Sequence, residues 1–177
     1  MTRLTQAIIF GILLGISNSG FALEAKAIIQ DSSAPAKSYG EVVLTDSAEG
    51  LKVNANLSGV PNPGKHGFHI HEFGSCQDSG KGAGSHFNPM QVQHGNLSHD
   101  GAEHAHMGDM GNIEIDADGS GSVSIILRDM YLIDGEFNVA GRAVILHEKE
   151  DDFTQPAGNA GSRIGCGAIV ISGLEQP

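Results

Sequence analysis

The chain has 177 residues, no tryptophan and a formal net charge of −11 at pH 7. This length suggests one domain with room for a substantial core. A strongly acidic surface repels nucleic acid and anionic lipid, so we expect neither nucleic acid nor a membrane as a partner.

The N-terminus has the layout of a secretory signal. Arg3 provides a short positive start, residues 7–16 are almost all apolar, and residues 17–22 are small or polar. This pattern predicts a signal peptide over 1–22 and a mature domain over 23–177. The apolar run is too short to span a bilayer, and the alternative is a buried first helix.

The rest of the chain is rich in short β-type runs that are separated by turn residues. Eight such runs are expected as strands: Ala25–Gln30, Tyr39–Thr45, Leu51–Ser58, Lys65–His71, Asn112–Asp116, Ser122–Leu127, Arg142–Leu146 and Ala168–Ser172. Alternation without helical spacers predicts an all-β fold, an eight-stranded antiparallel sandwich or barrel.

Two connections, 72–111 and 148–165, are too long to be turns. Long loops in a compact domain are usually functional or disordered. Cys76 lies in the first of these and Cys166 directly follows the second, and two cysteines in an exported protein predict a disulfide. The alternative is a pair of free thiols. We therefore expect two ordered loops that fold over a site.

Histidines are concentrated in one stretch, because eight of the nine lie between residues 65 and 109. On a strand, His69 and His71 would project to one side while Phe68 and Ile70 pack on the other. Two imidazoles on a stiff strand form half of a transition-metal site. The alternative is a polar strand face without a ligand.

The histidines are too many for one tetrahedral site, so a second metal is the simplest explanation. Histidines with one carboxylate suit zinc or copper. One possible set has three histidines and one aspartate, a combination typical of tetrahedral zinc sites: His86, His94, His106 and Asp109. An all-imidazole set suits copper: His69, His71, His86 and His147. His86 would then bridge the two metals through both ring nitrogens.

Five segments resemble the signature of the copper–zinc superoxide dismutases. They are Gly67–Gly74, His86–Pro89, Gly108–Asn112, His147–Lys149 and Gly158–Gly167. The resemblance runs in order from Ala25 to Ile171. It implies an immunoglobulin-like Greek-key barrel, one copper and one zinc per chain, and the disproportionation of superoxide to dioxygen and hydrogen peroxide.

The resemblance also implies a role for each matching residue. The copper ligands would be His69, His71, His86 and His147, and the zinc ligands His86, His94, His106 and Asp109. Cys76 and Cys166 match the family disulfide, and Arg163 matches the arginine that attracts the substrate anion. Asp151 matches the carboxylate that links ligands of the two metals. His66 matches the family's structural histidine beside the site. His86 would leave copper on reduction, gain a proton and later deliver it.

Three features depart from the common animal pattern. His94 and His106 are twelve residues apart, which makes His104 a rival for His106. His106 is preferred because it keeps the three-residue step to Asp109, and His99 and His104 are expected to face solvent. Cys76 follows His71 by five residues, as in many bacterial members. The segment 152–162 is short and lacks lysine and glutamate, so long-range guidance of the anion is expected to differ.

Two other functions fit parts of this pattern: an exported copper or zinc carrier on the same scaffold, and a zinc hydrolase that uses metal-bound water. The filled ligand set argues against both. The signal and the cysteine position favour export to a periplasm. The sequence leaves a homodimer open.

Overall fold

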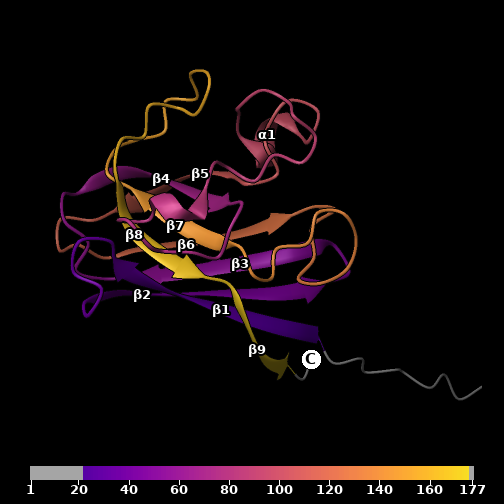
Figure 1. Cartoon of the computed structure of the whole chain (residues 1–177), viewed down its shortest axis with the longest axis horizontal. Coiled ribbons are helices and arrows are strands. Elements are labelled where there is room, and N and C mark those ends of the chain that lie inside the picture. The colour runs from indigo at the N-terminus through magenta and orange to yellow at the C-terminus, as the bar shows by residue number, and fades with distance from the viewer. Residues whose placement is uncertain (1–21, 176–177) are drawn as a thin grey trace, which may run out of the picture.

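The computed structural model describes residues 22–175, so the predicted signal peptide lies outside the described residues except for Ala22, which begins the first strand. Nine strands occur within this range (Figure 1). They are β1 (Ala22–Asp31), β2 (Ser38–Ser47), β3 (Gly50–Leu57), β4 (Gly64–His71), β5 (Asp109–Ile115), β6 (Gly121–Leu127), β7 (Ala143–His147), β8 (Arg163–Ala168) and β9 (Val170–Glu175). The predicted all-β class is confirmed.

The strands form one antiparallel sheet that curls into a nearly closed barrel. Their order is β5-β4-β7-β8-β1-β2-β3-β6, with β9 paired to β1. β5 and β6 stand at opposite ends of this order but lie beside each other, since a short turn joins them. β4 pairs with β7 rather than with β3, as in a Greek key.

The barrel core follows from residue alternation. In β3, Leu51, Val53 and Ala55 are buried while Lys52 is exposed, as expected for a strand with one face on the core. From His66 onward β4 is buried on both faces, because Phe68 and Ile70 face the core and the long loops cover the other side.

The predicted last strand, Ala168–Ser172, is wrong in its bounds. The chain instead forms β8 and β9, which meet at Ile169, and the second long loop ends at Ser162. Gly165 and Gly167 resemble turn residues in the sequence, but here they permit close packing. A side chain at Gly167 would meet the backbone of Ile28 in β1.

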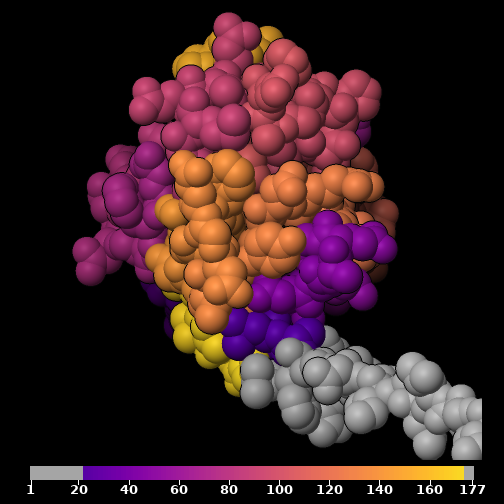
Figure 2. All heavy atoms as spheres, turned by 90° about the vertical axis from the view of Figure 1, so that its right-hand side faces the viewer, coloured from indigo at the N-terminus to yellow at the C-terminus, as the bar shows by residue number. Residues whose placement is uncertain are grey.

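The first long loop is ordered and contains a 3₁₀ turn, η1 (Lys81–Ala83), and one short helix, α1 (Leu97–Asp100). In Figure 2 this loop (pink) forms the upper part of the face, above the orange segment that follows β6. That segment, 128–142, is a third long connection, anchored in the core by Met130, Leu132 and Val139. No helix in residues 22–175 is long and apolar enough to cross a membrane.

Candidate metal centre

Strand β4 places the first two histidines. His69 and His71 are both almost completely buried, and their ring centroids lie 6.4 Å apart. Phe68 and Ile70 belong to the hydrophobic core on the other side. The alternation expected for this strand is therefore observed.

Backbone pairing beside β4 places His86. His86 forms an isolated antiparallel bridge with His71, and Phe87 donates its N–H to the carbonyl of Ile70 at 2.9 Å. Gly108 closes the same arrangement by accepting from the N–H of Ile70 at 2.9 Å. A side chain at Gly108 would collide with the Ile70 carbonyl, so glycine is required at this position.

The first of two metal-ligand clusters contains only imidazoles. Its members offer ring nitrogens that all lie within 4.8 Å of one another: His69, His71, His86 and His147. His147 is the last residue of β7, and its ring centroid lies 4.9 Å from that of His69 and 6.0 Å from that of His86. Residues far apart in the sequence therefore reach a common point, as the imidazole-only interpretation requires. We call this the all-histidine cluster.

The second group contains three imidazoles and one carboxylate: His86, His94, His106 and Asp109. Asp109 is the first residue of β5, not a loop residue, and pairs with His69 across the sheet. Its carboxylate accepts from Nδ1 of His86 and of His94, both at 2.8 Å, and of His106 at 3.2 Å. We call this the Asp109 cluster.

His106, and not its rival His104, reaches the Asp109 cluster. His106 is 8% exposed, whereas His104 is exposed in the first loop. The side chain of His99 is 85% exposed. The expectation that His99 and His104 face solvent is met.

The donor atoms fit two transition-metal ions. Nδ1 of His69 is buried without a hydrogen-bond partner, which is costly unless a cation binds there. In His71 and His147, Nδ1 faces the carbonyls of Gly84 and Gly161, so Nε2 is directed into the all-histidine cluster. His86 uses Nδ1 toward Asp109, which leaves Nε2 for the other cluster. This set of imidazoles and one carboxylate suits copper and zinc.

Asp151 hydrogen-bonds one histidine of each cluster. One carboxylate oxygen accepts from Nε2 of His69 at 2.7 Å and the other from Nε2 of His94 at 2.9 Å. Asp151 is fully buried, and its backbone exchanges two hydrogen bonds with the side-chain amide of Asn112 in β5. Such partners fix the tautomer and orientation of ligating imidazoles.

The protonation states differ between the clusters. Burial lowers the pKa of His69 to about 4 and that of His147 to about 3, so both rings are neutral at pH 7 and have a lone pair to offer. Burial also lowers the pKa of His94, but hydrogen bonds to Asp109 and Asp151 outweigh it and raise the pKa to about 9. A cation bound at Nδ1 of His94 therefore has to displace a proton.

His66 is a buried neighbour of the clusters and belongs to neither. Its Nδ1 lies 2.8 Å from the carbonyl oxygen of His147, and its Nε2 lies 2.7 Å from that of Asn62. The side chain thereby joins the end of β7 to the turn before β4.

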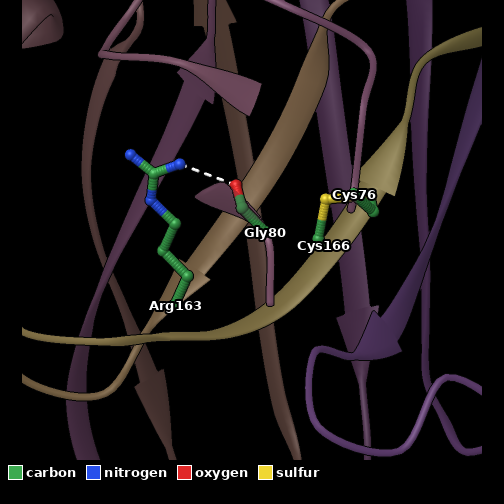
Figure 3. The surroundings of a disulfide bond; sticks show 4 residues. All are labelled: Cys76, Gly80, Arg163 and Cys166. Carbon is green, nitrogen blue, oxygen red and sulfur yellow. Dashed lines mark hydrogen bonds between the residues drawn. A yellow bond between two sulfur atoms is a disulfide. The ribbon is translucent and has the colours of Figure 1, made fainter. Parts of the chain in front are cut away.

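Arg163, the first residue of β8, lines a cavity of about 580 Å³ together with His71 and His147. Its guanidinium donates to the carbonyls of Gly80 and Gly84, both at 2.6 Å. The predicted disulfide between Cys76 and Cys166 is present beside it (Figure 3). The bond ties the loop that supplies Gly80 to the strand that supplies Arg163, so the arginine is held at the cavity wall.

Two residues at the centre were not anticipated from the sequence: Asn112, which holds Asp151, and Gln155, which hydrogen-bonds the backbone of His94. Both are neutral amides that act on backbone atoms. Asn112 lies at the end of one family-like segment and Gln155 in the short second loop, but an amide alone gives no signal of such a contact.

Comparison with known proteins agrees with this geometry. The family model for copper/zinc superoxide dismutase (SODC) matches residues 38–169. An extracellular copper–zinc superoxide dismutase of Haemonchus contortus is 34% identical over 97% of this chain and 100% of its own length. A copper–zinc superoxide dismutase of Dictyostelium discoideum is 38% identical over 72% of this chain and 85% of its own length.

Among solved structures, a double mutant of a SOD-like protein from Bacillus subtilis superposes with a TM-score of 0.73 and 35% identity, covering 82% of this chain and 96% of the other. Fold, sequence and the two clusters that share His86 thus lead to the same assignment. The chain belongs to the copper/zinc superoxide dismutase family and is an oxidoreductase that disproportionates superoxide with copper and zinc.

Proposed function

We propose that the all-histidine cluster holds the copper ion and the Asp109 cluster the zinc ion of this superoxide dismutase. The observation that carries this assignment is the membership of His86 in both clusters. A single imidazole can serve two ions only through its two nitrogens, and Nδ1 of His86 already faces Asp109. Nε2 is then the nitrogen for the other ion.

Copper held by the all-histidine cluster would supply one-electron redox chemistry, and zinc held by the Asp109 cluster would keep one oxidation state. The chain positions the reacting groups and relays protons that come from solvent. Nε2 of His86 is the atom at which a proton can be held and passed to the reduced oxygen species. Asp109 holds the other ring nitrogen of His86, Nδ1, and so fixes the orientation of the ring.

Arg163 is proposed to receive the substrate anion. Its guanidinium is held by two carbonyl oxygens on the wall of the cavity into which His71, His86 and His147 open. The local positive charge matters because the whole chain carries −11 and repels an anion of the same sign.

The test is the rate of superoxide decay with protein reconstituted with one copper and one zinc per chain. We expect fast decay that is lost when copper is removed and returns when copper is restored. If copper is bound by all four imidazoles but superoxide decays no faster than without copper, the protein is a metal carrier and not a dismutase. Hydrolysis that needs zinc alone would indicate the hydrolase.

His86→Ala provides the matched test of the shared ligand. We expect this variant to lose the visible absorption typical of the wild-type copper and to bind zinc more weakly, because one residue is removed from both ligand sets. A variant that alters only one of the two metals contradicts the shared role.

We also propose that the protein is exported, with the periplasm as its compartment and residues 1–22 removed. The signal-like N-terminus supports this, and a relative at 34% identity is named extracellular. Cell fractionation with N-terminal sequencing should find a chain that begins at Leu23 in the periplasm. A cytoplasmic chain that begins at Met1 contradicts the proposal.

A homodimer is proposed to form through the exposed apolar residues of β1 and β9. Ile28, Val170 and Ile171 are 47%, 62% and 40% exposed and line one shallow groove. Light scattering should give twice the monomer mass for the unchanged chain and the monomer mass for Val170→Lys. A wild-type monomer excludes the dimer.

A further inference from the structure

The second long loop contacts the backbone of a proposed zinc ligand through one side chain. The side-chain carbonyl oxygen of Gln155 accepts from the N–H of His94 at 3.0 Å, and its amide nitrogen donates to the carbonyl of His94 at 2.8 Å. The two residues are 61 positions apart. This pair of hydrogen bonds, the Gln155 clamp, joins the two long loops, which rise from the same end of the barrel (Figure 1).

The clamp contacts the backbone of a histidine whose two ring nitrogens both already have hydrogen-bond partners. Nδ1 of His94 faces Asp109 and Nε2 faces Asp151. The ring therefore has the correct orientation only if the backbone of His94 stays at its present distance from both carboxylates. Gln155 fixes that backbone directly, through the N–H and the carbonyl of His94.

The turn that carries Gln155 is held by its own hydrogen bonds. Asp152 accepts from the backbone and hydroxyl of Thr154, and the N–H of Gly158 donates to the carbonyl of Thr154 at 2.7 Å. The side-chain amide of Asn159 donates to the hydroxyl of Thr154 at 2.8 Å. None of these bonds involves His94, so the turn presents Gln155 whether or not zinc is bound.

We propose that Gln155 is a positioning residue for zinc: it holds His94 in place before the ion binds and slows release of the ion. This inference rests on the proposed zinc role of the Asp109 cluster. Residues that orient metal ligands from outside the ligand set often change metal affinity about 10–100-fold when they are replaced.

The test is the rate of zinc transfer from the zinc-loaded protein to a coloured chelator. We expect Gln155→Ala to release zinc about 10-fold faster, at the low end for such residues because the side chain is exposed. Gln155→Glu keeps the acceptor but loses the donor, and should release zinc at a rate between those of the unchanged chain and the alanine variant. The matched control is Gln93→Ala, which removes an exposed glutamine next to His94 but outside the clamp.

Two further measurements separate positioning from a general loss of structure. In the metal-free protein, the His94 amide should exchange with solvent about 10-fold faster in Gln155→Ala, since its acceptor is gone. The copper affinity of the zinc-free protein should be equal in the variant and the unchanged chain. Equal zinc release, or copper and zinc weakened to the same degree, overturns the proposal. If the unchanged chain binds no zinc, the proposed function fails together with this role.

Discussion

At the scale of single residues, the centre depends on side chains whose ends are held on more than one side. Arg163 is fixed by two carbonyl oxygens, Asp151 by two imidazoles, and His94 by two carboxylates. Each such contact removes rotational freedom before substrate or metal arrives, which is the basis of a preorganised site.

The role of Arg163 is tested by charge reversal. Arg163→Glu should lower the rate of superoxide decay severalfold at low salt with copper still bound, because an attractive charge becomes repulsive at the cavity wall. The measurement is the decay rate against ionic strength. Arg128→Glu makes the same charge change in a groove beside α1, away from the cavity, and should leave the rate close to that of the unchanged chain. An unaltered rate in Arg163→Glu removes Arg163 from substrate attraction.

At the scale of elements, the disulfide joins the first long loop to β8 across 90 residues. In the chain-entropy account, a loop of this length stabilises the folded state by about 4–5 kcal/mol, and measured values are often smaller. The same bond keeps the Gly80 carbonyl within hydrogen-bonding distance of Arg163. One covalent link therefore both stabilises the fold and positions the arginine.

Replacing both cysteines with serine should therefore lower the free energy of unfolding by several kcal/mol, up to the 4–5 kcal/mol of that account. It should also weaken the dependence of the rate on Arg163, because the loop can move away from the guanidinium. Denaturant unfolding and superoxide decay measure the two effects. Chemical reduction of the unchanged chain provides an independent route to the same state. Unfolding at the same denaturant concentration in all forms contradicts the prediction.

A second testable contact joins the end of β1 to the start of β2. The hydroxyl of Tyr39 donates to Asp31 at 2.7 Å. Burial and the neighbouring carboxylate raise the pKa of Tyr39 to about 12 from the ordinary value of 10.0. A raised pKa in the folded state contributes stability that is complete below pH 10 and is lost as the pH rises toward 12.

Tyr39→Phe should be less stable than the unchanged chain at pH 8 by about 1.5–3 kcal/mol, the usual contribution of a hydrogen bond to a charged group. The difference should shrink between pH 10 and 12, because only the unchanged chain loses this contribution there. Urea unfolding at a series of pH values gives the measurement. A difference that grows over this range has the wrong sign for the assigned interaction.

At the scale of the whole molecule, the metal centre lies where both long loops meet the barrel, so the ions connect parts of the chain that are distant in sequence. Binding to the folded state alone stabilises by about 4 kcal/mol when the free ligand is 1,000 times its dissociation constant. For a domain of this size, 1 kcal/mol corresponds to a shift of about 2–4 °C in melting temperature.

Removal of both metals should therefore lower the melting temperature by roughly 10 °C or more. Restoring zinc alone should recover part of the loss and restoring both metals the whole. Calorimetry of the metal-free, zinc-loaded and fully loaded forms gives the comparison. Equal melting temperatures would mean that the clusters do not bind metal in the folded state.

Local features of the sequence were enough to predict the β class, seven of the strands to within a few residues and the disulfide. Strand alternation placed His69 and His71 on one side, whereas the preference for His106 over His104 came from the resemblance to the family, which has the same three-residue step to the aspartate. The turn residues between strands and the two isolated cysteines are likewise local signals.

Contacts across long separations required the tertiary structure. The break between β8 and β9 was missed because Gly165 and Gly167 indicate a turn, whereas their packing against β1 keeps them in a strand. Asn112 and Gln155 act on backbone atoms 39 and 61 residues away, and no residue type signals such a partner. Sequence therefore determines which side chains can bind a metal, while only the closed barrel decides which neutral amides hold them in place.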